Sequence, residues 1–216
     1  YIATLSIDGK ILDTAWVKGI DAPKGMGILN NHLYVTNIDE IIEIDIPSAT
    51  ILKRYKAEGS QFLNDIATDP KTGMIFITDS GTGQVYILFD GKVSSWLQGP
   101  MFKGANGLFL QGNILYIGTA NSILKADIVS GEVVLCVSGT GAVDGLFVNS
   151  EGKYIYSDWN GSVYVSGFKK KPQLLLNTTT QQENAADFGV IVSKNFILIP
   201  TFFNNKIVCY TSTLLK

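Results

Sequence analysis

Histidine and cysteine are almost absent from this 216-residue chain, which has one histidine and two cysteines. A structural zinc site needs Cys and His ligands clustered at short spacing, whereas His32, Cys136 and Cys209 stand far apart in the sequence. A single histidine also gives little basis for a Ser-His-Asp catalytic set. Both cysteines lie in apolar strand patterns, where buried free thiols are the expected state. A disulfide is an open alternative that their positions do not support.

The chain also lacks an excess of charge and any long hydrophobic run. Charged residues make up 17% of the sequence and the net charge is −2, so nothing indicates nucleic-acid binding. No stretch approaches the roughly 18 apolar residues of a membrane-spanning helix. The first residues read as a strand and not as a signal peptide, which leaves a periplasmic or secreted location and a cytoplasmic location both open. We expect a monomer with no nucleic-acid or membrane partner.

What the chain does contain is a repeated motif, in which a polar Asn or Asp opens a short apolar strand. The clearest copies begin at Asn64, Asn106 and Asp144. Each copy continues through a turn into a second apolar strand. Repetition at a constant spacing indicates that one structural unit is used several times along the chain.

These units start near residues 24, 64, 106, 144 and 187, so each holds about 40 residues and four short strands. No window keeps the 3.6-residue period of an amphipathic helix. Four-stranded units of this length without intervening helices are typical of β-propeller blades. A β-sandwich also uses short strands, but it does not call for the same opening at constant spacing. The sequence therefore predicts an all-β fold, a β-propeller.

The number of blades is inferred from the chain ends. Residues 1–18 read as two strands joined by an Asp-Gly turn, which is a good hairpin signal, and they match the outer half of a blade. Together with the five later units, this predicts six four-stranded antiparallel blades, the first of them incomplete. Residues 1–216 are interpreted as a single domain. We expect a further segment of about 30–40 residues upstream of Tyr1 to complete the first blade.

In a propeller, the first strand of each blade lines the central channel and begins at one mouth of it. Four polar residues are then expected around the axis: Asn64, Asn106, Asp144 and Asp187. Asp79 and Asp158 end second strands, which places them on the same face but farther out. A ring of carboxylate and carboxamide oxygens suits a hard cation such as Ca²⁺ or Mg²⁺. The sequence thus predicts a site at the channel mouth.

The same residues also have a purely local explanation. Asn and Asp are preferred in turns because their side chains bond to their own backbone, and glycine follows them because it reaches positive φ without strain. Three such positions in register on one channel face favour a site, but the turn-forming interpretation stays open.

The repeat openings resemble one particular family of propellers. The residues that carry the likeness are Leu63-Asn64-Asp65, Ala105-Asn106-Gly107-Leu108 and Val143-Asp144-Gly145-Leu146. In this order and spacing they are similar to the regucalcin/gluconolactonase (senescence-marker-protein-like) family of six-bladed β-propellers. The resemblance implies that Asn106 and Asp144 are metal ligands and that Asp144 is the general base for lactone hydrolysis. It also implies that Asn64 contacts substrate or a metal-bound water.

Two departures limit what the resemblance implies. The family's first metal ligand is a Glu in the opening strand of blade one, so a third ligand is expected upstream of Tyr1. The family's substrate-binding Arg is replaced here by Phe62. The leading hypothesis is a metal-dependent, gluconolactonase-like hydrolase of a small lactone or related ester, with Ca²⁺ as the favoured divalent cation and a small molecule as its substrate. In it Asp79, Asp158 and Asp187 join Asn64 around substrate or water. The alternative is a non-catalytic propeller that binds a protein or carbohydrate.

Overall fold

The computed structural model describes residues 1–215, which divide into two compact units: unit 1 spans Tyr1–Lys103 and unit 2 begins at Gly104. Both units consist of strands, and the helical segments of the described chain are short 3₁₀ turns. The expected scarcity of helix is therefore confirmed. Within residues 1–215, no helix has the length and apolar character needed to cross a membrane. The assignment of residues 1–216 to a single domain stays a prediction.

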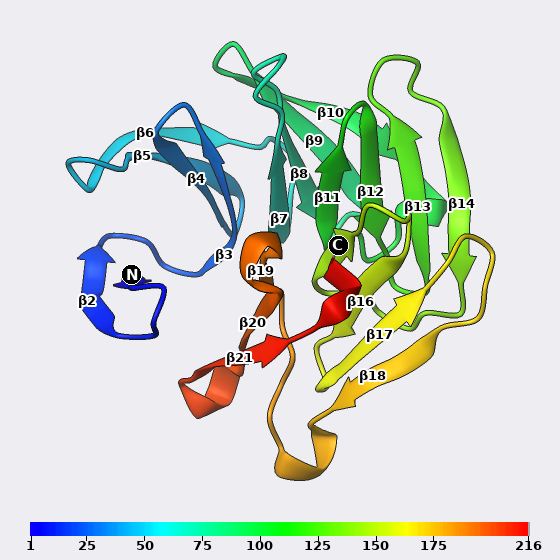
Figure 1. The fold of residues 1–216 in the computed structure, drawn as a ribbon. Coiled ribbons are helices and arrows are strands. Elements are labelled where there is room, and N and C mark those ends of the chain that lie inside the picture. The colour runs from blue at the N-terminus through cyan, green and yellow to red at the C-terminus, as the bar shows by residue number, and fades with distance from the viewer. Residues whose placement is uncertain (216) are drawn as a thin grey trace. The chain divides into compact units, whose positions relative to one another are not determined.

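Unit 1 contains one two-stranded sheet and two four-stranded sheets (Figure 1). The two-stranded sheet consists of β1 (Ile2–Leu5) and β2 (Ile11–Val17). The next sheet consists of β3 (Pro23–Leu29), β4 (His32–Asn37), β5 (Glu40–Asp45) and β6 (Thr50–Lys56). The last sheet consists of β7 (Leu63–Thr68), β8 (Ile75–Asp79), β9 (Gln84–Phe89) and β10 (Lys92–Gln98), and the 3₁₀ turn η1 (Pro100–Phe102) follows it.

Unit 2 contains two four-stranded sheets and one three-stranded sheet. The first consists of β11 (Leu108–Gln111), β12 (Ile114–Gly118), β13 (Ser122–Asp127) and β14 (Val133–Ser138). The second consists of β15 (Leu146–Val148), β16 (Tyr154–Asp158), β17 (Ser162–Ser166) and β18 (Gln173–Asn177). The third consists of β19 (Gly189–Ile191), β20 (Phe196–Pro200) and β21 (Ile207–Thr211). Four 3₁₀ turns complete the unit: η2 (Thr179–Gln181), η3 (Val192–Lys194), η4 (Phe202–Asn204) and η5 (Thr213–Leu215).

Each of the five larger sheets is an antiparallel meander in which consecutive strands are neighbours. Turn chemistry explains the tight connections. Asn30 and Asn31 both have positive φ (50° and 64°) between β3 and β4, and Asp90 and Gly91 (48° and 70°) play the same part between β9 and β10. Two successive residues with positive φ form the turn whose twist matches that of paired strands. The local sequence thus sets the hairpins of each blade.

The prediction of six blades is wrong, because residues 1–215 form a β-propeller with five blades of three or four strands each. The count of six depended on reading residues 1–18 as half of an incomplete blade. Among the strands of the described residues, β1 and β2 pair with each other alone, in a two-stranded sheet. Their apolar side chains Ile2 and Val17 pack into the same cluster as Leu33 and Ile42 of the β3–β6 blade. The expected upstream segment rested on the six-blade count and loses that support.

The core of each unit lies between the faces of neighbouring sheets. In unit 1, Ile41 of one blade shares a cluster with Leu63 and Ile77 of the next. In unit 2, Ile155 packs with Ile197 of the adjacent sheet. Strands between two sheets are buried on both faces, as β8 shows with five consecutive buried residues. Cys136 is a buried free thiol as expected, whereas Cys209 is a free thiol on the surface.

Hydroxyl groups near the ends of second strands join one blade to the next. Thr36 accepts a hydrogen bond from the backbone N–H of Gly25 (3.0 Å) and donates to the carbonyl of Asn64 in the next blade (2.5 Å). Ser157 does the same in unit 2, where it accepts from Gly145 (2.9 Å) and donates to the carbonyl of Ala186 (2.8 Å). Because buried backbone groups must be paired, these hydroxyls fix the spacing between the starts of successive blades.

Candidate functional site

Asn106 and Asp144 stand just before the first strands of two neighbouring blades in unit 2. The backbone N–H of Asn106 donates to the carbonyl of Gly118 at 2.9 Å, and the N–H of Asp144 donates to the carbonyl of Ser157 at 2.8 Å. The second strand of each blade therefore fixes the backbone of the polar residue that precedes the first. Their side chains are held at defined points by regular sheet pairing.

The two side chains meet directly. Nδ2 of Asn106 donates a hydrogen bond to Oδ1 of Asp144 at 2.9 Å, although 38 positions separate the residues in the sequence. Both residues are half-buried. A hydrogen bond to an ionised acceptor is stronger than one between neutral groups, so the Asn106 amide orients the carboxyl group of Asp144.

The surroundings of Asp144 disfavour its ionised form. Burial raises the pKa of this carboxyl group to about 6. The hydrogen bond from Asn106 lowers the pKa in part, and the negative charge of Asp158 raises it further. A carboxyl group whose pKa lies near neutral can exchange a proton at physiological pH, which is the property that general acid–base catalysis requires.

A second carboxylate and two phenols lie along β16 and β17. Oδ1 of Asp158 accepts from the backbone N–H of Ser162 at 2.9 Å, and Oδ2 accepts from the Tyr164 hydroxyl at 3.4 Å. The Tyr164 ring stacks on Tyr156 with ring centroids 5.3 Å apart. Tyr156 is fully buried, and its hydroxyl has no hydrogen-bond partner among the described residues. The Asp158 carboxylate is thus held by residues of its own blade, close enough to Asp144 for its charge to raise the pKa of that group.

Asp187 occupies the corresponding position before β19. Its Oδ1 accepts a hydrogen bond from the backbone N–H of Phe188 at 2.8 Å. A Cβ atom built on Gly145 would lie 2.9 Å from the same oxygen, so the close approach requires glycine there. The side chain of Asp187 therefore lies against the residue that follows Asp144.

Asn64 and Asp79 belong to unit 1. The amide of Asn64 donates to the Ser80 hydroxyl at 3.1 Å. Asp79 is fully buried, and its carboxylate accepts from the backbone N–H groups of Gln61 (3.0 Å) and Phe62 (2.9 Å), among others. Burial by itself would raise the pKa of Asp79, but the hydrogen bonds, led by that of the Thr82 hydroxyl, outweigh it and hold the pKa below its ordinary value.

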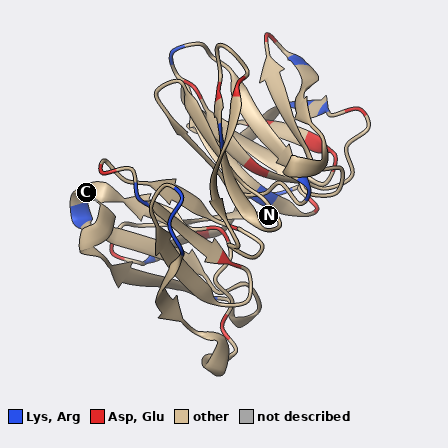
Figure 2. Cartoon of the chain, turned by 90° about the vertical axis from the view of Figure 1, so that its right-hand side faces the viewer, with Lys and Arg blue, Asp and Glu red and all other residues tan. Residues whose placement is uncertain are grey.

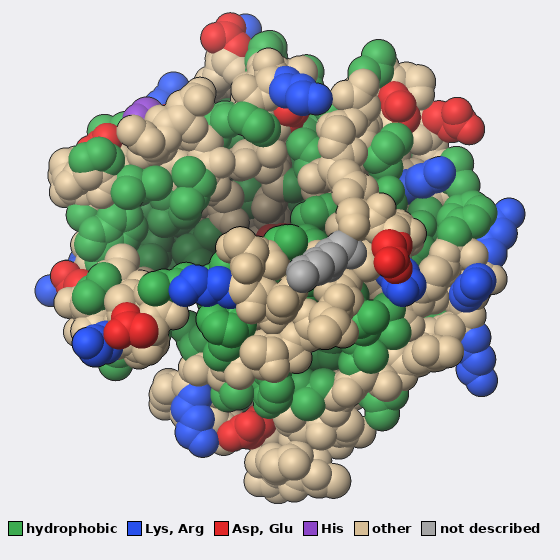
Figure 3. All heavy atoms as spheres, in the orientation of Figure 1, with side chains coloured by type: hydrophobic (Ala, Val, Ile, Leu, Met, Phe, Trp, Pro, Cys, Tyr) green, Lys and Arg blue, Asp and Glu red, His purple; other side chains and the backbone are tan. Residues whose placement is uncertain are grey.

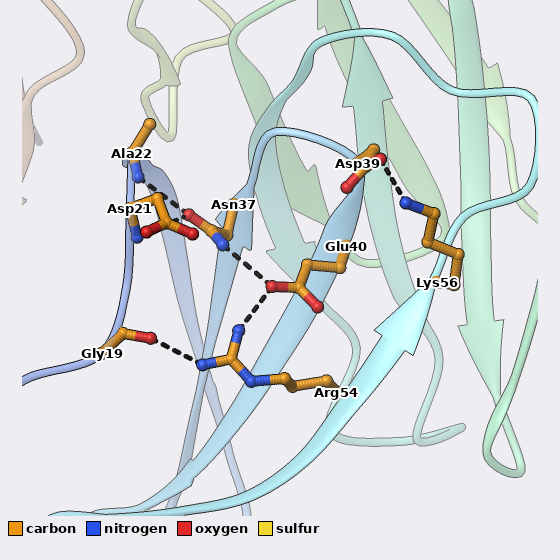
Figure 4. Close-up of polar contacts among 8 residues, drawn as sticks. All are labelled: Gly19, Asp21, Ala22, Asn37, Asp39, Glu40, Arg54 and Lys56. Atoms are coloured by element: carbon orange, nitrogen blue, oxygen red, sulfur yellow. Dashed lines mark hydrogen bonds and ion pairs between the residues drawn. The ribbon is translucent and has the colours of Figure 1, made fainter.

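The equivalent residue of the previous blade has the same local role (Figure 4). Oδ1 of Asn37 accepts from the backbone N–H groups of Asp21 (3.1 Å) and Ala22 (2.8 Å), and its amide donates to Glu40 at 2.9 Å. Glu40 also pairs with Arg54 at 2.5 Å. An Asn or Asp at the end of a second strand therefore secures the segment that leads into the first strand, a role that the sequence analysis did not consider.

One positively charged side chain in unit 1, that of Lys24, was not among the predicted site residues. Nζ of Lys24, at the start of β3, lies 4.1 Å from the ring centroid of Phe62 and donates to the carbonyl of Ala22 at 3.2 Å. Burial lowers the pKa of this ammonium group. The signal was available, because Lys24 holds the position in its repeat that Asn64 holds in the next.

The structure therefore brings one group of predicted site residues together within unit 2: Asn106, Asp144, Asp158 and Asp187. Asn64 and Asp79 lie in unit 1, and a centre shared by all six residues stays a prediction. Among residues 1–215, no three His, Cys, Asp or Glu side chains gather as a metal-ligand cluster. Calcium binding likewise stays a prediction.

Unit 2 also has an open groove of about 980 Å³ at the opposite ends of β16 and β17. Lysine side chains line it together with Phe168: Lys125, Lys153, Lys170 and Lys171. Figure 3 shows basic side chains gathered near the turn between β17 and β18. Elsewhere, acidic and basic residues are interspersed along the chain (Figure 2). Lys170 and Lys171 are exposed near the turn between β17 and β18, whereas Lys125 is half-buried within β13. Asp144 is not among the residues that line the groove.

Comparison with solved structures places the chain in a fold class. No protein-family model matches the sequence, and no curated protein sequence matches it. A streptogramin B lyase structure aligns with a TM-score of 0.64 at 15% identity, covering 92% of this chain and 72% of the other. A chain of a nidogen/laminin complex aligns with a TM-score of 0.67 at 12% identity, covering 88% and 80%. The computationally designed protein Ika8 aligns with a TM-score of 0.60 at 15% identity, covering 95% and 75%.

These identities are low, so the likenesses show the fold alone. Together with the five meander sheets, they show that the chain is a β-propeller protein. Propellers host enzymes and binding proteins alike. The function must therefore be argued from the residues around Asp144.

Proposed function

We propose that this propeller is a hydrolase that opens a small lactone or related ester, with Asp144 as the general base. The observation that carries the proposal is the Asn106–Asp144 pair: a half-buried carboxyl group with a pKa of about 6, oriented by an amide 2.9 Å away. A purely turn-forming aspartate would bond to its own backbone. Asp144 instead directs one oxygen toward the side chain of another blade.

The chemistry follows from the protonation state of Asp144. Above pH 6 its carboxylate accepts a proton from a water molecule while the water oxygen attacks the carbonyl carbon of the lactone. The tetrahedral intermediate then collapses, and the bond from the carbonyl carbon to the ring oxygen breaks. The protonated Asp144 returns its proton to that oxygen, which leaves a hydroxy acid and regenerates the ionised carboxylate.

The oxygen atoms of the candidate site suit a divalent cation, and we favour Ca²⁺. Asn106 and Asp144 would hold it, since both offer oxygen atoms of the type that hard cations prefer. The repulsion between Asp144 and Asp158 disfavours negative charge here, and a cation relieves such repulsion. When bound, the cation would supply polarisation of the substrate carbonyl.

The test is hydrolysis of a panel of sugar lactones and simple esters, followed by acid release, with and without added Ca²⁺, Mg²⁺ or Mn²⁺. We expect Asp144→Asn to lose at least a hundredfold in turnover, in the range of general-base contributions, while circular dichroism shows an intact fold. Asp90→Asn is the matched control, because Asp90 lies in a hairpin turn with φ of 48°, which asparagine also adopts. Equal turnover of Asp144→Asn and the wild-type protein would refute the proposal.

A non-catalytic propeller that binds a protein or carbohydrate is the second candidate. Exposed aromatic side chains near Asp158 favour it: Trp159, Phe202 and Phe203. Binding of ligands without turnover of any lactone or ester in the panel would select this candidate over the hydrolase.

A further inference from the structure

Three aromatic side chains form an exposed cluster in unit 2. Trp159, Phe202 and Phe203 have exposed fractions of 42%, 56% and 70%. The Trp159 ring lies edge-on to Phe202 and Phe203, with centroid distances of 5.6 and 5.8 Å, and the two Phe rings are 4.8 Å apart. Large aromatic groups are usually buried, so three mutually packed rings left at the surface mark a candidate binding site.

The cluster is built from corresponding ends of two adjacent sheets. Trp159 begins the turn between β16 and β17, and the two Phe residues lie in η4, between β20 and β21 (Figure 1). Trp159 directly follows Asp158, whose charge raises the pKa of Asp144. The aromatic cluster therefore begins at the residue next to Asp158, at the end of β16.

The backbone at Phe202 is held in an unfavourable conformation. Its φ is +54°, in a region that bulky residues avoid. The backbone N–H of Thr201 donates to the carbonyl of Lys206 at 2.9 Å, and the Lys206 N–H donates to the Thr201 hydroxyl at 3.2 Å. Strain of this kind is found where a side chain must be presented to a ligand.

The polar surroundings favour a neutral ligand. The ammonium group of Lys206 is paired with Glu183 at 3.3 Å, so no strong net charge faces the cluster from that side. The amide of Asn184 donates to the carbonyl of Trp159 at 2.8 Å, which fixes the turn. Asn160 follows Trp159 and Asn204 follows Phe203 in the sequence, and both bear amide groups that bond hydroxyls in either direction.

The small exposed area of the cluster favours a small ligand over a protein partner. A stable protein interface buries about 800 Å² on each side, whereas one aromatic side chain buries at most about 150–250 Å². Three partly exposed rings therefore cover too little area for a protein interface. Each ring is steeply tilted to the other two, with interplanar angles of 74°, 81° and 87°, so the cluster forms an angled aromatic surface. Such a surface suits a small cyclic sugar, whose C–H groups pack on the face of one ring and the edge of another while its hydroxyls bond to nearby amides.

We propose that Trp159, Phe202 and Phe203 form an aromatic platform that binds the ring of a neutral cyclic carbohydrate. This deepens the proposed function, on which it rests for the identity of the substrate as a sugar lactone. Binding to the platform would place the ring beside Asp158, at the edge of the Asp144 site.

The test uses ligands that cannot be hydrolysed, so that binding is measured apart from catalysis. Saturation-transfer NMR is recorded with methyl β-glucopyranoside and methyl β-galactopyranoside, and with open-chain glucitol as the non-cyclic comparison. We expect transfer to the ring C–H protons of the pyranosides, and at least tenfold weaker binding by Trp159→Ala and by Phe203→Ala. Phe168→Ala is the matched control, because Phe168 is an aromatic residue of the same unit with a similar exposed fraction of 46%.

The outcomes separate the two proposals. Pyranoside binding by Asp144→Asn and the wild-type protein, without lactone turnover by either, would sustain the platform and refute the hydrolase. Lactone turnover with an unchanged KM in Trp159→Ala and Phe203→Ala would refute the platform and leave the hydrolase standing. Absence of transfer to any pyranoside would also overturn the platform, as would self-association that Phe203→Ala abolishes, since a second copy would then be the occupant.

Discussion

Gly107 lies directly against the backbone of Asp144: a Cβ atom built on this glycine would sit 2.1 Å from the Asp144 carbonyl oxygen. The contact joins the starts of two neighbouring blades. Gly25 makes the same kind of approach to Asp65 in unit 1, at 2.4 Å from its Cα. The glycine of the repeat is therefore required by packing between blades, in addition to any role in a turn.

The first prediction follows from this contact. Gly107→Ala should destabilise the protein by about 2–4 kcal/mol, because the atom it meets belongs to a backbone that cannot rotate away. It should also displace Asp144 and reduce turnover. Chemical denaturation measures the first effect and the lactone assay the second.

Gly189→Ala is the matched control for Gly107→Ala. A Cβ atom there would meet only Leu198, at an ordinary 3.9 Å. Its free energy of unfolding should stay within about 0.5 kcal/mol of the wild-type value. Equal losses in the two variants would show that the close approach at Gly107 has no special cost.

The second prediction concerns stability and pH at Asp144. The folded state raises the pKa of this group to about 6, above its unfolded value of about 3.9. Between these values the folded state binds more protons than the unfolded state, so the free energy of unfolding falls as pH rises. Asp144→Asn should remove this dependence and stabilise the protein above pH 6 by about 1–3 kcal/mol. Urea denaturation at pH 4, 6 and 8 measures the free energy of unfolding of both proteins. An Asp144→Asn variant that is less stable than the wild-type protein at pH 8 would contradict the prediction.

The third prediction concerns the acid limb of the pH–rate profile. If ionised Asp144 is the base, kcat/KM should rise with pH and reach half its plateau near pH 6. A cation held by Asp144 stabilises the carboxylate and should move this midpoint to lower pH. Profiles recorded in EDTA and in millimolar Ca²⁺ test both statements. A midpoint that stays the same in both solutions would argue against a cation at Asp144.

The fourth prediction assigns a structural role to Asp79. Asp79→Asn should destabilise the protein by about 2–4 kcal/mol. The carboxylate now accepts hydrogen bonds from backbone N–H groups, and the amide NH₂ of asparagine would place a donor against those donors. The folded state lowers the pKa of Asp79. Its contribution to stability is therefore present above the unfolded pKa and lost as pH falls through the folded value. Thermal unfolding between pH 2 and 7 tests this, with Asp90→Asn as the control. A shift in Tm no larger than that of the control would contradict it.

Much of the fold could be read from local patterns. The repeat openings at Asn64, Asn106 and Asp144 fall within two residues of the first residues of β7, β11 and β15. Strand and turn formation depend on alternation and on residues such as Asn30 and Gly91, which act over a few positions. The number of blades was harder to predict, because the sequence pattern of a hairpin such as β1–β2 is the same whether or not a further strand pairs with it.

The sequence by itself determined an all-β repeat with polar residues before the first strand of each blade, since these features arise from short-range periodicity and turn chemistry. Only the tertiary structure decided which side chains meet. In the folded chain, Asp79 accepts hydrogen bonds from the backbone of its own blade, and Asn106 bonds to Asp144 although 38 positions separate them. The tertiary structure also gathered Trp159 with Phe202 at the surface. Such pairings depend on how neighbouring sheets pack, and no local pattern encodes the distance between two blades.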